Sequence, residues 1–156
     1  MRKLIMSGAG TVLALTVLSA LAADTSEPQL RALVPKIVQA WESMDLGKID
    51  PYYAADSDLT FFDIAPLKYA NWAEYRTGVQ KMFFEPNRSL KFTLKDDLRI
   101  HRRGQLAWAT FTFGADVVSK QGANSHLDGR WTLLLEQRKS QWVVVHEHVS
   151  VPLGGS

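Results

Sequence analysis

The fold is decided by residues 126–151, which read HLDGRWTLLLEQRKSQWVVVHEHVSV. This stretch is rich in Val, Leu, Thr and Trp, and the polar triplet Arg138-Lys139-Ser140 divides it into two runs, as in two long strands joined by a turn. The residues before it have the same texture back to Ser89. We therefore predict four long antiparallel strands in a meander, over residues 90–100, 106–119, 126–137 and 141–151.

The first half of the chain has helical spacing instead. Apolar residues recur every three or four positions between Leu30 and Trp41, which predicts one buried stripe of an α-helix. Pro35 lies inside this stripe, so the helix is expected to kink or to begin near it, and residues 46–48 are expected to end it. Asp50-Pro51 then has the form of an N-cap followed by proline, which predicts a second, short helix.

Two further elements complete the order. Residues 59–64 read LTFFDI and are typical of a short strand. Asn71 and Glu74 have the spacing of a capping box and predict another helix, which must end before Pro86. Helices followed by antiparallel strands indicate an α+β domain with a curved sheet wrapped around the helices.

Composition limits the possible classes of protein. The chain has 156 residues, 46% of them hydrophobic and 22% charged, which suits one globular domain with a sizeable core. It has no cysteine, and this excludes a disulfide framework, thiolate metal sites and a cysteine nucleophile.

The amino terminus has the layout of a secretory signal. Arg2 and Lys3 precede an uncharged stretch from Leu4 to Ala23, and Ala20-Leu21-Ala22 fits a cleavage site. We predict a signal peptide over residues 1–22 and a domain over residues 23–156, in an exported protein that is periplasmic or secreted. The alternative is an uncleaved anchor, since about 20 apolar residues could just span a bilayer.

Cleavage would leave a nearly neutral protein. Loss of Arg2 and Lys3 would leave 16 basic residues against 16 acidic ones. Proteins that bind nucleic acids normally carry a basic excess on one face. We therefore expect neither nucleic-acid binding nor, after cleavage, a membrane partner.

Side-chain alternation predicts what each face of the sheet carries, because successive strand residues point to opposite sides. One face would carry Trp108, Thr110, Thr112, Arg130, Thr132, Leu134, Trp142, Val144, His146, His148 and Ser150. The other would carry Ala107, Ala109, Phe111, Phe113, Trp131, Leu133, Leu135, Val143, Val145, Glu147 and Val149. Neither set is wholly polar, so we expect helices on one face and a second copy of the chain, in a homodimer, on the other. A bulge would exchange the faces locally.

His146 and His148 lie on one strand face, about 6.6 Å apart along the strand. This spacing suits metal ligation, acid–base chemistry or plain hydrogen bonding. A zinc site needs at least a third ligand, and the other two histidines, His101 and His126, fall near predicted hairpin ends. We therefore predict no metal and no cofactor, and keep both histidines as candidate catalytic residues.

Two charged residues are candidates for a pocket. Arg130 lies in an apolar strand, where a guanidinium normally needs a carboxylate from the protein or a ligand; alternatively its head reaches water. Asp63 ends the apolar run near Pro66, where partial desolvation would raise its pKa and suit a general base; alternatively it caps a turn.

Four more residues are candidate ligand contacts. Tyr53, Trp72 and Trp108 could form pocket walls or belong to the core. Thr132 shares the predicted face of Arg130 and the two histidines.

Three phrases of the sequence are similar to those of a known superfamily. They are YAADSD at residues 53–58, GRWTLLLE at residues 129–136, and WVVVHEHVSVP at residues 142–152. With the order of elements, they resemble a SnoaL-like domain of the nuclear transport factor two and ketosteroid isomerase superfamily. The resemblance implies a cone, formed by a curved sheet closed by helices around a pocket and commonly paired in dimers. Its members range from isomerases and dehydratases to assembly domains, so it indicates a fold rather than an activity.

The resemblance to ketosteroid isomerases is incomplete. Asp63 is similar in position to their catalytic aspartate, but Ile64 and Ala65 separate it from Pro66. Their oxyanion tyrosine would fall near Ile37, in a helix without tyrosine, and their late-strand acid near residues 130–132. Steroid isomerisation is therefore not expected.

The sequence supports two functions. In the first, the cone binds a small molecule that is partly apolar, and acidic if Arg130 faces it; isomerase or dehydratase chemistry could follow, with Asp63 or a histidine as base. In the second, the pocket is filled and the domain is a non-catalytic dimerisation or assembly module. An open cavity on which Asp63, Arg130 and His146 converge would favour the first.

Overall fold

A computed structural model describes residues 26–153 of the chain. The predicted signal peptide, residues 1–22, and its cleavage site lie outside these residues. No helix in the described part is long and apolar enough to cross a bilayer. The helical elements are α1 (Ser26–Glu42), α2 (Leu46–Ile49), the 3₁₀ turn η1 (Asp50–Tyr52), α3 (Trp72–Val79) and the π-helical turn η2 (Gln80–Phe84). The strands are β1 (Asn87–Leu94), β2 (Arg99–Arg103), β3 (Leu106–Ser119), β4 (Asn124–Arg138) and β5 (Gln141–Ser150).

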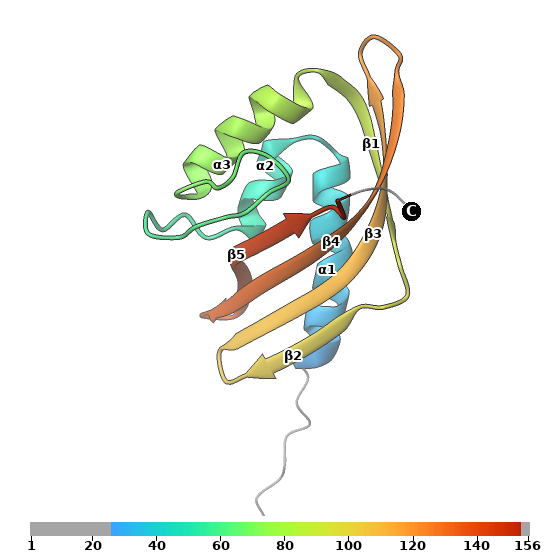
Figure 1. Ribbon diagram of the computed structural model, residues 1–156. Coiled ribbons are helices and arrows are strands. Elements are labelled where there is room, and N and C mark those ends of the chain that lie inside the picture. The colour runs from blue at the N-terminus through green and yellow to red at the C-terminus, as the bar shows by residue number, and fades with distance from the viewer. Residues whose placement is uncertain (1–25, 154–156) are drawn as a thin grey trace, which may run out of the picture.

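The strands form one antiparallel, strongly curved sheet, and the helices lie on its concave face (Figure 1). β3, β4 and β5 are neighbours, and β1 and β2 both pair with β3 on its other side. The predicted α+β class and the curved sheet are confirmed.

The predicted strand over residues 90–100 is two strands. β1 pairs with the second half of β3 and β2 with its first half, and the chain leaves the sheet between them. At this break the Asp97 carboxylate accepts the backbone N–H of Thr112 at 3.0 Å and its hydroxyl at 2.8 Å. An aspartate side chain thus takes a hydrogen bond that a strand backbone would otherwise accept.

The helical predictions need two corrections. α1 begins at Ser26 and contains Pro35 in its interior, and it ends at Glu42 rather than at residues 46–48. Residues 46–49 instead form α2, because the Asp45 carboxylate accepts the N–H of Gly47 at 2.9 Å and caps a new turn.

The helix predicted from Asn71 and Glu74 is confirmed as α3. Asn71 accepts the N–H of Glu74 at 2.9 Å. The Glu74 carboxylate accepts the N–H of Ala70 at 2.7 Å, one residue before the position that a capping box would use.

The strand predicted over residues 59–64 is not a strand. Phe61 forms an isolated bridge with Tyr69, and Phe62 one with His148. Phe62 donates its N–H to the Glu147 carbonyl and accepts the N–H of Val149, both at 2.9 Å. This segment therefore lies along the outer edge of β5 without extending the sheet.

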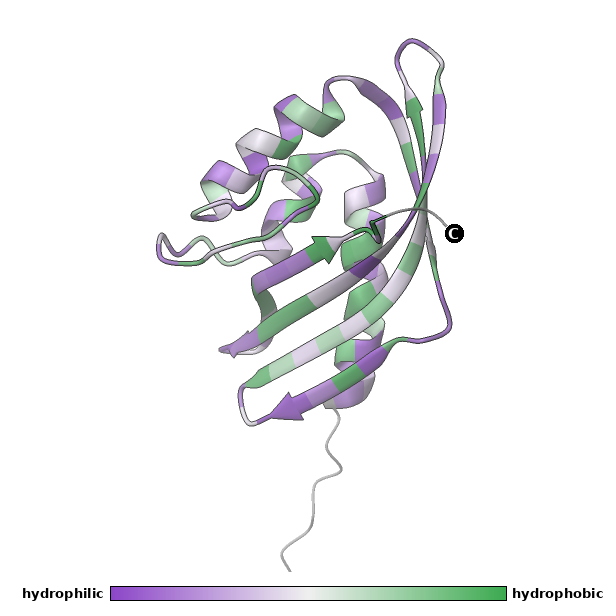
Figure 2. Cartoon of the chain, in the orientation of Figure 1, coloured by the Kyte–Doolittle hydropathy of each residue, from purple (hydrophilic) through white to green (hydrophobic). Residues whose placement is uncertain are grey.

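A bulge in β5 changes which residues face the helices. Leu134 of β4 pairs with His146 but Leu135 pairs with Val144, so Val145 is an extra residue. Trp142 and Val144 therefore point inward, on the same side as Trp131, Glu147 and Val149. Sequence alternation had instead grouped Trp142 and Val144 with the histidines. In Figure 2 green segments alternate with near-white ones along β3, as expected for a strand with one buried face.

Candidate functional site

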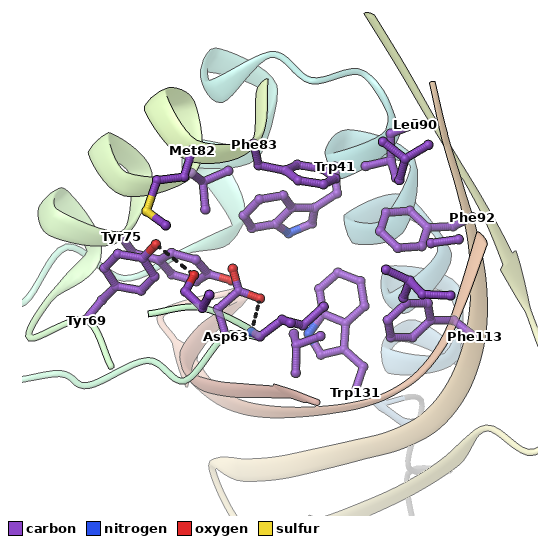
Figure 3. A pocket seen from close by; sticks show the side chains of 17 residues that line it. Trp41, Asp63, Tyr69, Tyr75, Met82, Phe83, Leu90, Phe92, Phe113 and Trp131 are labelled. Carbon is purple, nitrogen blue, oxygen red and sulfur yellow. Dashed lines mark hydrogen bonds between the residues drawn. The ribbon is translucent and has the colours of Figure 1, made fainter. Parts of the chain in front are cut away.

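A cavity of about 270 Å³ lies between the concave face of the sheet and the helices (Figure 3). Its lining residues are mostly apolar, and the side chains with polar atoms among them are those of Asp63, Tyr69, Tyr75, Trp41 and Trp131. Ile64 and Met82 line it and are 49% and 55% exposed, so they mark its mouth. The other lining residues are Trp41, Ala65, Tyr69, Tyr75, Val79, Phe83, Leu90, Phe92, Phe113, Ala115, Val117, Leu127, Trp131 and Val149.

Two glycines shape the cavity wall. Gly129 lies opposite Phe113 across β3 and β4, and a methyl group there would come within 2.4 Å of the Phe113 ring. Gly78 of α3 would likewise meet the Tyr69 ring at 2.4 Å. Both rings occupy space that a side chain on the glycine would take, and a methyl group there would require either ring to shift.

Asp63 is held in the cavity wall by the loop that leaves the edge of β5. It is half-buried, and its carboxylate accepts the N–H of Ile64 at 2.7 Å. Figure 3 shows it projecting between the rings of Tyr69 and Tyr75 on one side and Trp131 on the other. Burial raises the pKa of Asp63 to about 6, although the bond from Ile64 opposes the rise.

A second carboxyl, that of Glu147, lies behind this wall. Glu147 is completely buried and accepts hydrogen bonds from the hydroxyls of Tyr53 and Tyr75 and, at 3.2 Å, from the indole N–H of Trp131. Trp41 in turn donates to the Tyr53 hydroxyl at 2.8 Å. Burial raises the pKa of Glu147 to about 7; its three donors oppose this shift, and the charge of Asp63 adds to it.

Tyr53 and Trp72 lie in the core beside the cavity. Their rings stack with centroids 4.1 Å apart. Asp50 accepts the Trp72 indole N–H at 3.1 Å and a bidentate pair from Arg76 at 3.0 Å, which fixes α3 against η1. Neither Tyr53 nor Trp72 lines the cavity; Tyr53 supports it through Glu147.

The remaining candidate residues lie on the outer face of the sheet, away from the cavity. Arg130 and His148 are exposed, and Trp108, Thr132 and His146 are half-buried. Thr132 pairs with His148 across the strands, and Leu134 with both Trp108 and His146. The structure therefore brings Asp63, Tyr53 and Trp72 to the region of the cavity, and Arg130, Thr132, Trp108 and the histidines to the opposite side.

The histidines have local partners on that side. His146 donates from Nδ1 to the Thr60 carbonyl at 2.6 Å, and the Phe62 ring meets both imidazoles edge-on at centroid distances of 5.3 and 5.7 Å. In residues 26–153 no three His, Asp or Glu side chains are grouped as metal ligands would be.

Sequence reasoning missed Glu147 as a site residue. The available signal was a single carboxylate in the alternating apolar set Val143, Val145, Glu147 and Val149. A charged residue in such a register must be paired or hydrogen-bonded when the face is buried. Its donors come from three distant parts of the chain, which alternation could not identify.

This geometry suits a small ligand rather than a macromolecule. The cavity is concave, mostly apolar and opens on one side, and one carboxylate with a raised pKa faces it. Such a carboxylate can accept a proton or a hydrogen bond from a bound molecule near neutral pH.

The sequence profile of the SnoaL-like domain matches residues 30–154. The chain belongs to this family. SnoaL-like domains share the fold of the nuclear transport factor 2-like superfamily, and the structure agrees. Among curated proteins, none matches the chain significantly.

Solved structures of the superfamily superpose over most of the chain. A nuclear transport factor 2-like protein from Salmonella enterica serovar Typhimurium has a TM-score of 0.77 at 17% identity, covering 86% of this chain and 96% of that one. A proposed dehydratase from Streptomyces avermitilis has a TM-score of 0.73 at 14% sequence identity, and the match covers 84% of this chain and 99% of that one. The association domain of C. elegans CaMKII has a TM-score of 0.65 at 16% sequence identity, and the match covers 81% of this chain and 96% of that one. At these identities the likeness shows the SnoaL-like fold alone.

Proposed function

We propose that this SnoaL-like domain binds a small, largely apolar molecule in its cone, and that Asp63 accepts a proton or hydrogen bond from it. One observation carries the proposal: the cone is hollow, and a half-buried carboxylate faces the hollow. An acidic ligand is no longer favoured, because Arg130, the residue that would have anchored it, is exposed on the other face of the sheet.

If a reaction follows binding, proton abstraction next to a carbonyl or elimination of water is the class that fits. Both need a base in a site that excludes water. Asp63 supplies the base, and its raised pKa brings its basicity close to neutral pH. The fold likeness to a proposed dehydratase is compatible with this chemistry.

2-Naphthol tests the proposal, because it is apolar and becomes a strong acid when excited by light. Its emission reports transfer of its proton to a nearby base. We expect binding, with naphtholate emission that is lost in Asp63→Asn and kept in Asp58→Asn, an exposed carboxylate outside the cavity wall.

Filling the cavity provides the second arm of this experiment. Ala115 is 2% exposed and lines the cavity, so Ala115→Leu should weaken 2-naphthol binding at least about tenfold, since a bulky side chain would occupy the ligand's space. Near-ultraviolet circular dichroism checks that the variant is folded. Binding that is absent, or unaffected by Ala115→Leu, would contradict the proposal.

A second candidate function, a homodimer or larger assembly formed through the outer face of the sheet, has its own support. The helices of the described chain lie on the concave face (Figure 1), while Leu106 is 45% exposed and Phe62 36% exposed on or beside the outer face. Trp108 adds a half-buried indole there. Light scattering of the wild type and of Trp108→Glu tests it. A wild-type dimer that dissociates in the variant supports the assembly, and a wild-type monomer excludes it.

Export is also a proposal, since residues 1–22 lie outside the described part. Intact-mass measurement of protein recovered from an expressing bacterium tests it. Export with cleavage predicts a mass that corresponds to a chain beginning at Ala23, and recovery of the uncleaved chain would contradict it.

A further inference from the structure

The wall of the cavity is rich in aromatic rings. Seven of its lining residues are aromatic: Trp41, Tyr69, Tyr75, Phe83, Phe92, Phe113 and Trp131. They come from α1, the loop before α3, α3, η2, β1, β3 and β4, so they surround the space rather than cover one side of it (Figure 3). The faces of such rings carry partial negative charge and attract cations.

Asp63 faces this space without a cation of its own. Within residues 26–153 no Lys, Arg or His lines the cavity, and Asp63 makes no ion pair; its one hydrogen bond comes from the backbone of the next residue. A partly desolvated carboxylate is costly unless a positive group compensates it. The described residues therefore supply no positive group for Asp63, and a bound ligand is left to supply it.

The buried carboxyl behind the wall adds to the negative potential when it is ionised, as it mostly is at pH 7.5, because its pKa is about 7. Glu147 has neutral donors only, from two tyrosines and one tryptophan. The charge of Asp63 contributes to the raised pKa of Tyr69, Tyr75 and Glu147, so the titratable groups around the cavity all resist further negative charge. An anion would be repelled here, and a cation would be stabilised.

We propose that the cavity takes a protonated amine carried on an apolar body of about two rings, with the ammonium group at Asp63 and the rings among the aromatic side chains. The size follows from volume: an apolar protein cavity of about 150 Å³ accepts one benzene, and this one measures about 270 Å³. This inference rests on the proposed binding function, whose ligand it specifies, and holds with or without a subsequent reaction.

Three isosteric probes test the charge preference at pH 7.5 by calorimetry: 2-naphthylmethylamine, 2-naphthylmethanol and 2-naphthoic acid. We expect the amine to bind about tenfold or more tightly than the alcohol, because it gains an ion pair and contacts with ring faces. The acid should bind most weakly. Asp63→Asn should reduce the affinity for the amine to that for the alcohol, and Asp58→Asn should keep the preference.

The outcomes separate the two proposals. If the amine and the alcohol bind equally in the wild type, or if the acid binds best, the amine inference is overturned while binding in the cone stands. If the amine preference survives in Asp63→Asn, the ammonium group does not lie at Asp63 and the inference also fails. If no probe binds, the proposed binding function itself fails.

Discussion

The two faces of the sheet differ in what their polar residues do. On the concave side, Glu147 of β5 and Asp63 of the adjoining loop lie among aromatic rings, and burial raises the pKa of both carboxyls. On the outer face, Arg130 and His148 are exposed, and His148 pairs across the strands with Thr132. Ionisable side chains from both sides of the sheet were candidates, but only those on the concave side lie in the wall of the cavity or directly behind it. Burial and packing therefore select the candidate site.

The largest expected difference between the faces is in stability and concerns two tryptophans. Trp131 is 3% exposed, packs against Trp41, Phe92, Phe111 and Phe113, and donates to Glu147, so Trp131→Ala should lower the free energy of unfolding by about 3–5 kcal/mol. Trp108 is half-buried on the outer face, so Trp108→Ala should lower the free energy of unfolding by only about 1 kcal/mol. Urea unfolding measures both, and equal losses would remove the distinction.

Glu147 should make the stability of the domain depend on pH. Its pKa is about 7 in the folded chain and near 4.5 in the unfolded chain, so the folded state favours the protonated form. Stability should therefore fall as pH rises from about 4.5 to 7, by about 3 kcal/mol from this group. Glu147→Gln should remove most of the fall, leaving a smaller share due to Asp63.

Glu136→Gln is the matched control for that measurement. Glu136 is a half-buried residue near the end of β4, and its carboxylate accepts a hydrogen bond from Arg138. Its variant should keep the wild-type decline, and a Glu147→Gln variant that also keeps it would show that the buried carboxyl is not the source.

Two glycines on opposite faces should respond differently to an added methyl group. In Gly129→Ala the Phe113 ring must move toward the cavity, at a cost of about 1–3 kcal/mol and with weaker binding of 2-naphthol. In Gly114→Ala the nearest atom, at 3.1 Å, belongs to the exposed side chain of His126, which can turn away. Thermal unfolding should show a clear loss for the first variant and little change for the second.

The smallest effect is expected at the histidines. Because His148 is exposed and the cavity lies on the other side of the sheet, His148→Ala should change the affinity for 2-naphthol by less than about twofold. A larger change, measured by fluorescence titration, would mean that the two faces are coupled.

Much of the fold could be predicted from the sequence. Strand texture and the spacing of Leu30 to Trp41 identified the sheet and α1, because burial of one face imposes a period on the chain. The bulge at Val145 could not be predicted, since one extra residue leaves no mark in a run of three valines. Its position decides that Trp142 and Val144 face the core rather than the side of the histidines.

The candidate site was less accessible to sequence reasoning. Asp63 could be chosen because it ends an apolar run, and the structure places it in the cavity wall. Arg130 and the histidines were candidates for their chemistry, and only three-dimensional packing shows that they face away from the cavity. Glu147 acquires its environment from Tyr53, Tyr75 and Trp131, and such a meeting of distant segments has no local signature.

The segment that lies along β5 has a consequence for solubility. An uncovered border strand offers free amide and carbonyl groups to strands of other molecules, a common route to aggregation. Phe62 takes up part of this border through its hydrogen bonds to Glu147 and Val149, and Ala54 donates to Val144 further along. Asp63 directly follows Phe62, so the segment that covers the edge of β5 also positions the carboxylate in the cavity wall. A substitution that displaces this segment would therefore affect both the edge of the sheet and the site.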